Sequence, residues 1–460
     1  MGHDGATMAS GEHDGPVSAG ESGACAGMDL GVLAGEARAE VEDFTRGQSP
    51  TGAELFLTAS RRVSLAYEVD PGRFTLSRGE SVSAAARVWR ETGSGVGTGF
   101  AALSVGGAED LGRVLALASE RRQAGTGSPL PALPAPSAPP SGLAELSAER
   151  ARELSEHVAR TVLPPGVVVQ AAVLTCTASA SLLVRSEGVL QGSVGARQEA
   201  VVRCETSRGA IVDGVAAPLG EAWDLEPLRA RLADAVETLE GPAEAADPAL
   251  PLVLRPAVAA PLIAALAWML RGDVAVATPA LVRAVGKKLF PSVLSVVDDP
   301  LHPLGAWRRS VDDEGAPARA LRLIDEGRFQ GFLHSAATAA RLGVEPNGRG
   351  LRAEGSPPTP SALNLFVVPR RDALPEHYTE LVARVETFTT MPRPGVVSLM
   401  AGGWEVKEGQ RVRRLAPVEL RLPVLETLRA LRGVGADLAF FPTADGCGTP
   451  TLILPPLLGG

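Results

Sequence analysis

Histidine, cysteine and adjacent carboxylates are the side chains here that could hold a metal ion or move a proton, and they are few and scattered. The chain has six histidines among 460 residues. His302 lies in DPLHPLG and His334 in FLHSAA, two contexts that share no motif with each other or with His377. A hydrogen-bonded histidine is the expected role for each. A zinc site that joins His302, His334 and Cys447 is a hypothesis without support from their spacing.

Two groups of carboxylates are candidates for binding a hard cation such as calcium. Asp298 and Asp299 precede a proline, and Asp312, Asp313 and Glu314 precede a glycine. Calcium requires roughly six to eight oxygen ligands, which neither group supplies from its own side chains. Acidic residues beside proline or glycine commonly cap turns. The sequence therefore favours a structural role for both groups.

The remaining histidines and the cysteines show no ligand pattern either. His3 and His13 each begin an HDG triplet near the N-terminus, without a cysteine or histidine at zinc-ligand spacing. The cysteines form no CxxC pair and no framework of secreted disulfides. They are Cys25, Cys176, Cys204 and Cys447. Reduced thiols in a cytoplasmic protein are the simplest expectation.

Composition favours a mixed fold and excludes several classes of protein. Hydrophobic residues make up 45% and aromatic residues 4%, while glycine and proline are plentiful, which favours strands and turns. A net charge of -9 with dispersed arginines argues against binding of a nucleic-acid backbone. No GxSxG elbow or Walker loop occurs. No apolar run reaches the roughly 18 to 20 residues of a membrane span, so no membrane partner is expected.

The chain divides by composition into a leader and two folded regions, for which the predicted class is α+β. Residues 1–47 are rich in glycine, alanine, serine and acidic residues and are expected to be a disordered leader. Residues 48–245 combine alternating strand patterns (AELFLTAS, RRVSLAYEV, RFTLSRGE, SVSAAARVW) with helical segments in two αβ halves, joined by a Pro-rich linker at 125–142. Residues 249–460 are predicted to form a β-rich domain with one buried apolar helix near 258–270.

Four stretches of the chain stand in an order that matches one known family. They are SLLVRSEGVLQGSVGARQEAVVR, SVDDEGAPARALRLIDEGRFQGFLHSAATAARLG, NGRGLRAEGSPPTPSALNLFVVP and AGGWEVKEGQRVRRLAPVEL. They resemble, in turn, a hairpin with a long strand, an acidic DDEG stretch, a Gly- and Arg-rich loop and a strand-turn-strand unit of the TldD/PmbA peptidase-modulator family. The likeness runs from about Gly52 and is greatest to the non-catalytic PmbA (TldE) branch.

The resemblance implies where a catalytic helix would lie, since active members carry HExxxH. The two histidines of that pattern hold zinc, and the glutamate takes a proton from metal-activated water. In PLIAALAWMLRGD these positions fall on Ile263, Ala264 and Trp268, none of which can bind zinc or transfer a proton. No catalytic or cofactor-binding residue is therefore assigned. Cys447 resembles the family's C-terminal cysteine ligand and is the one metal candidate, although a lone cysteine more often packs as a small buried residue.

The resemblance thus implies a non-catalytic subunit of a heteromeric zinc peptidase. Zinc would lie in a TldD-like partner that carries HExxxH, and extended or unfolded peptides would be the substrate. Two alternatives stay open, a metallopeptidase with a relocated zinc site and a stand-alone peptide-binding protein. If the apolar helix is a packing element, restoring His, Glu and His should cost about 1 to 3 kcal/mol for each unsatisfied group.

Overall fold

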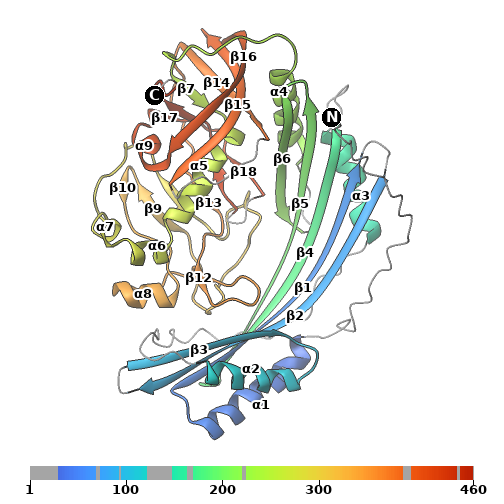
Figure 1. Cartoon of the computed structure of the whole chain (residues 1–460), viewed down its shortest axis with the longest axis vertical. Helices are drawn as coiled ribbons and strands as arrows, with labels where there is room; N and C mark the ends of the chain where they lie inside the picture. Colours follow the sequence, from blue (N-terminus) through green and yellow to red (C-terminus); the bar gives the residue numbers. More distant parts are fainter. Residues whose placement is uncertain are drawn as a thin grey trace, which may run out of the picture.

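The structure, a computed structural model, describes most of the chain from Leu30 onward (Figure 1). The described residues are 30–68, 73–92, 95–121, 148–162, 169–219, 224–386, 395–442 and 446–458. The predicted linker 125–142 lies outside these ranges, as do residues 1–29 of the predicted leader, with His3, His13 and Cys25. The mixed α+β class predicted from the sequence is confirmed.

Helix α1 (Leu30–Gln48) occupies residues that composition assigned to the leader, and for these residues the prediction of disorder is wrong. Its apolar residues recur at helical spacing and form one buried stripe. They are Leu30, Leu33, Ala34, Ala37 and Val41. The stripe packs into a hydrophobic cluster with the first strands. Burial of this apolar face offsets the conformational entropy that the segment loses when it forms a helix. The prediction of disorder did not take this burial into account.

The first six strands form a continuous antiparallel run within a twelve-stranded sheet, in the order β6-β5-β4-β1-β2-β3. They are β1 (Gly52–Glu68), β2 (Arg73–Thr92), β3 (Gly95–Ser104), β4 (Val169–Arg185), β5 (Leu190–Thr206) and β6 (Gly209–Pro218). The four short segments predicted at the start merge into the long pair β1 and β2. Arg61 lies opposite Glu80 in this pair and their side chains form an ion pair at 2.6 Å. The charged residues that interrupt the apolar alternation therefore lie within the long strands, because they pair across them.

Helices cover one face of these strands and leave the other face to the C-terminal region (Figure 1). Besides α1, the covering helices are α2 (Glu109–Glu120), α3 (Ala148–Val162) and α4 (Glu226–Leu239). Side chains alternate between the faces of a strand. Leu55 and Leu57 of β1 accordingly pack under the helices, whereas Thr58 and Ser60 line cavities on the opposite face.

The C-terminal region extends the large sheet and builds a second one. Strand β14 (His377–Val385) pairs with β6 at Val385 and Ile211, which joins the two regions in one sheet. The other strands on that side are β7 (Leu252–Leu254), β15 (Val396–Lys407), β16 (Gln410–Pro423), β17 (Gly433–Val434) and β20 (Leu452–Leu454). The second sheet runs β10-β9-β8-β13-β19-β18. Its strands are β8 (Val296–Asp298), β9 (Leu321–Asp325), β10 (Arg328–Phe329), β13 (Leu365–Val367), β18 (Ala439–Phe440) and β19 (Gly448–Thr449).

Helix α5 (Pro256–Met269) is the apolar helix that the sequence predicts, and it packs against both sheets of the C-terminal region. It contacts β14 and β15 on one side and β13 and β19 on the other. The shorter elements are α6 (Gly272–Ala277), α7 (Pro279–Val282), α8 (Ala336–Leu342), α9 (Val424–Arg429) and the pair β11 (Gly350–Leu351) and β12 (Thr359–Pro360). Within the described ranges, no helix combines the length and apolar character needed to cross a membrane.

Candidate functional site

The three family positions on helix α5 lie in different surroundings. Ile263 has 0% exposure and belongs to the main hydrophobic cluster of the C-terminal region. Ala264 is partly buried against the same cluster, and Trp268 is 40% exposed. An alkyl group, a methyl group and an indole offer no ligand to zinc. The residues present therefore do not fit a zinc ion at this position.

Cys447 lies directly before β19, within the core that α5 helps to form. It has 0% exposure and shares a hydrophobic cluster with Ile263. The described cysteines, Cys176, Cys204 and Cys447, form no disulfide. In the described part of the chain, no group of three or more His, Cys, Asp or Glu side chains is placed to hold a metal ion. His302, His334 and Cys447 are thus not brought together as a ligand set.

The histidines of the C-terminal region have separate local contacts. The His302 ring lies 4.6 Å from that of Phe366 and 4.9 Å from that of Phe440, measured between centroids. His334 is buried, and this burial lowers its pKa to about 4. His377 Nε2 lies 2.9 Å from a glutamate carboxylate on the neighbouring strand β15.

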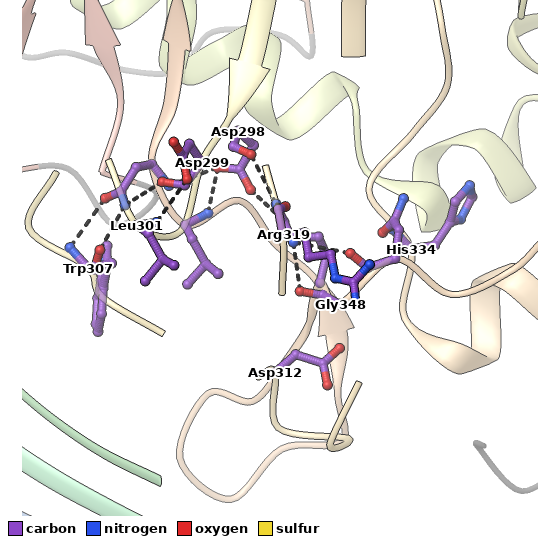
Figure 2. Close-up of polar contacts among 12 residues, drawn as sticks. Asp298, Asp299, Leu301, Trp307, Asp312, Arg319, His334 and Gly348 are labelled. Atoms are coloured by element: carbon purple, nitrogen blue, oxygen red, sulfur yellow. Dashed lines mark hydrogen bonds and ion pairs between the residues drawn. The ribbon is translucent and has the colours of Figure 1, made fainter. Parts of the chain in front are cut away.

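Asp298 and Asp299 hold neighbouring loops in place through hydrogen bonds and an ion pair (Figure 2). Asp298 Oδ1 accepts the Asn364 backbone N–H at 2.8 Å, and its second carboxylate oxygen pairs with the fully buried Arg349. The Asn364 side chain donates to the backbone carbonyl groups of Asp299 and Trp307, both at 2.8 Å. The buried carboxylate at Asp298 therefore fixes, through Asn364, the backbone at Trp307.

Asp312 closes the turn that carries the acidic DDEG stretch. Its carboxylate accepts backbone N–H groups of Glu314 at 3.0 Å, Ala316 at 2.8 Å and Gly350 at 2.8 Å. Burial raises the pKa of Asp312 to about 7, and the neighbouring Glu314 charge adds to this effect. These contacts give the group the structural role that its turn context favours.

A buried ion cluster joins the two regions, and it escaped the sequence analysis. Arg87 of β2 donates to Glu54 of β1 at 2.6 Å and to Glu314 at 2.9 Å, while Arg352 pairs with Glu54. All four side chains are buried. Burial disfavours ionisation of Glu54, yet the Arg87 and Arg352 guanidinium groups bring its pKa below the usual value. The one available signal was a glutamate inside the apolar strand pattern AELFL.

Three adjoining cavities form a groove between the uncovered face of the long strands and loops of the C-terminal region. Their volumes are about 490, 60 and 190 Å³. The first two share Ser179 and Arg309 as lining residues, and the last two share Thr58 and Arg352. We call this continuous feature the sheet groove. Its sheet side is lined mainly by small hydroxyl residues, among them Thr58, Ser60, Ser81, Ser83, Thr177, Ser179, Ser181 and Ser193.

The lining of the sheet groove offers hydroxyl groups from the strands and guanidinium groups from both sides. Such donors suit a polar ligand held in an elongated space. Apart from Asp313, which the sequence analysis considered as a cation ligand, none of the sheet-groove residues was singled out from the sequence. Their alternation with buried apolar residues along the strands was the signal that could have found them.

The fold and the site define an α+β protein with a polar groove along its long strands and a core helix that lacks metal ligands. Residues 248–457 match the family described as the PmbA/TldA metallopeptidase C-terminal domain, which confirms the resemblance predicted from the sequence. The chain is also similar to a metalloprotease of Methanothermobacter thermautotrophicus, at 28% identity over 162 residues, and to one of Synechocystis, at 27% over 173 residues. These alignments cover 33% and 36% of this chain and 35% and 37% of the relatives. The chain thus spans about a third of the length of the curated relatives it matches.

Two solved structures share the fold over nearly the whole chain. TldE from Thermococcus kodakarensis has a TM-score of 0.74 and 19% identity, covering 91% of this chain and 98% of its own. A protein of Thermotoga maritima, described as a putative modulator of a DNA gyrase, has a TM-score of 0.74 and 17% identity, covering 92% and 98%. The chain is therefore related to metallopeptidases and has the fold of TldE.

Proposed function

We propose that this chain is the non-catalytic subunit of a heteromeric zinc peptidase that acts on extended or unfolded peptides. The proposal rests on one observation, that Ile263 and Cys447 are both fully buried in one hydrophobic core where active family members are expected to hold zinc. The partner subunit would carry HExxxH and the zinc ion. This chain would contribute the sheet groove, whose hydroxyl and guanidinium donors suit the polar backbone of an extended polypeptide.

The test is co-expression of this chain with an HExxxH-containing protein of the same family, followed by co-purification, zinc analysis and a peptide-cleavage assay. We expect a complex whose zinc and cleavage activity disappear when the histidines of the partner are replaced. Cleavage should be unaffected by Cys447→Ala, provided that this variant folds. Stoichiometric zinc and chelator-sensitive cleavage by this chain alone would overturn the proposal in favour of a relocated metal site.

A stand-alone peptide-binding protein is the second candidate, and the sheet groove is the observation that favours it. Peptide binding without any association with an HExxxH-containing chain would support it. We place either form in the cytoplasm, a proposal supported by the absence of disulfides among the described cysteines. Detection of the native chain in cell fractions tests that placement.

A further inference from the structure

The sheet groove crosses the strands of the large sheet. The cavity of about 190 Å³ lies on β1 and β2, the cavity of about 60 Å³ on β1, β4 and β5, and the cavity of about 490 Å³ on β4 and β5. These strands lie side by side in the order β2-β1-β4-β5. Strands β1 and β4 are each paired with a neighbour on both edges, so their main chains offer no free edge to a ligand in the groove. Recognition on this floor therefore depends on side chains.

A row of four hydroxyl groups crosses the floor of the groove. Thr58 lies opposite Ser83 on one neighbouring strand and Ser181 on the other, and Ser181 lies opposite Ser193. All four residues line the two smaller cavities. Neighbouring strands are about 4.8 Å apart, so the row spans roughly 14 Å. We call Ser83, Thr58, Ser181 and Ser193 the hydroxyl row.

The hydrogen-bonding capacity of the hydroxyl row is unused within the described part of the chain, where no residue bonds to its side-chain oxygens. In the adjacent row, by contrast, the Ser60 and Ser81 hydroxyl groups bond to each other at 2.8 Å. Ser181 is only 8% exposed, and it faces the groove because its neighbours Ala180 and Leu182 pack under the helices. A buried hydroxyl without a partner lowers stability. A ligand in the groove can supply that partner.

We propose that the hydroxyl row binds the main chain of an extended peptide that crosses the strands, with small side chains where the peptide passes Ser181. The inference rests on the proposed function, because it assumes that a peptide occupies the sheet groove. A hydroxyl group both donates and accepts, so one row can serve the N–H and C=O groups of a main chain. Hydroxyl groups held on a paired sheet are positioned before the ligand arrives, which lowers the entropic cost of binding.

The restriction to small side chains follows from the narrow section of the groove at Ser181. Its volume of about 60 Å³ is far below the roughly 300 Å³ at which ligand pockets usually begin. Arg309, Asp313 and Arg352 line it together with the strands. Arg309 and Asp313 form an ion pair at 2.9 Å, and Arg352 pairs with Glu54. These contacts hold the side chains in place, so the section favours glycine, alanine or serine over leucine.

The test measures binding of fluorescent peptides to the full chain by anisotropy. One probe is a glycine–serine repeat, and the other has leucine in place of serine. The hydroxyl variant is Thr58→Val with Ser181→Ala, which removes two hydroxyl groups with little change in shape. The matched control is Ser64→Ala with Thr175→Val, a hydroxyl pair bonded at 3.1 Å on the same two strands that lines none of the three cavities.

A second variant closes the narrow section and leaves every hydroxyl group in place. Gly195 lines this section, and a Cβ atom added there would meet only Ser179 Oγ, at 3.6 Å, which is an ordinary contact. Gly195→Val therefore places a side chain in the cavity, and valine suits a strand. The matched control is Gly79→Val on β2, which lines none of the three cavities and where an added Cβ atom would have no neighbour within 4 Å.

We expect the hydroxyl variant to bind the glycine–serine probe about tenfold more weakly than the parent does, because two neutral hydrogen bonds are lost. Gly195→Val should weaken binding at least as much, and both controls should bind like the parent. The leucine probe should bind the parent more weakly than the glycine–serine probe, because its side chains do not fit the narrow section.

Three results would contradict these expectations in different ways. Parent-like binding by both groove variants, or equal weakening by the controls, would overturn the hydroxyl row and leave a peptide-binding function in place. Equal binding of the two probes by the parent would overturn the restriction to small side chains. If the parent binds neither probe, the hydroxyl row is not a peptide site, and co-purification with an HExxxH-containing chain decides the proposed function separately.

Discussion

His334 and Asp312, two buried titratable residues, oppose each other in their effect on stability. Burial lowers the pKa of His334 to about 4, below its ordinary value of about 6.5, so the folded state loses stability as pH falls through this interval. Burial raises the pKa of Asp312 from its ordinary acidic range to about 7, so the folded state loses stability as pH rises toward 7. Between about pH 4 and 6.5, the two residues change the unfolding free energy with pH in opposite directions, and their contributions partly cancel.

Single substitutions should separate these slopes. Relative to the parent, His334→Gln should lose stability as pH rises from 4.5 to 6.5, by at most about 1.4 kcal/mol per pH unit. Asp312→Asn should instead gain stability relative to the parent over the same interval. Urea unfolding at several pH values measures the unfolding free energy of each protein. The comparison uses the change of this free energy with pH, because the hydrogen bonds lost in each substitution lower stability at every pH. Parallel curves for parent and both variants would contradict the assignment.

On helix α5, the buried and exposed family positions should respond differently to restoration of zinc ligands. Ile263→His removes a fully buried aliphatic side chain and inserts a polar ring, which should cost at least about 3 kcal/mol of unfolding free energy. Trp268→His changes a side chain that is 40% exposed and should cost no more than about 1 kcal/mol. Ile263→Val serves as the matched control, with an expected loss of about 1 kcal/mol. Equal unfolding midpoints for Ile263→His and the parent would show that this face of α5 is not a packing surface.

A helix or strand could be predicted when its sequence signal lay within the segment itself, and was missed or divided when the signal depended on residues elsewhere in the fold. The apolar helix α5 could be located because nearly every residue in it is apolar. Helix α1 was missed because its buried stripe, from Leu30 to Val41, is interspersed with glycine and acidic residues. The long pair β1 and β2 was divided into short strands because Arg61 and Glu80 compensate each other only once the strands are paired.

At the scale of the whole molecule, the features that shape the candidate site come from residues far apart in the chain. Arg87 and Glu314 are 227 residues apart, and Glu54 and Arg352 are 298 apart, so no spacing rule could pair them. The sheet groove likewise combines hydroxyl residues of the strands with arginines of the C-terminal loops. Resemblance to a family indicated the fold and the helix positions that carry no metal ligand. Only the folded structure shows which polar side chains lie in contact.

The buried ion cluster should hold the N-terminal sheet and the C-terminal loops together. Glu314→Gln keeps an oxygen for the Ala336 N–H, bonded at 2.7 Å in the parent, but removes the charge that faces Arg87. Arg87 and Arg352 would then share the single carboxylate of Glu54 in a buried setting, which should cost about 3 to 5 kcal/mol of unfolding free energy.

The exposed pair Arg322 and Asp325 provides the control for this change, since Asp325→Asn should cost under about 1 kcal/mol. Adding Arg87→Met to Glu314→Gln should cost less than the sum of the two single changes, because the two side chains are in direct contact. Chemical denaturation of the parent, the three single variants and the double variant measures each change in unfolding free energy. A Glu314→Gln loss no larger than that of Asp325→Asn would mean that the regions are joined mainly by other contacts, such as the strand pairing of β6 with β14.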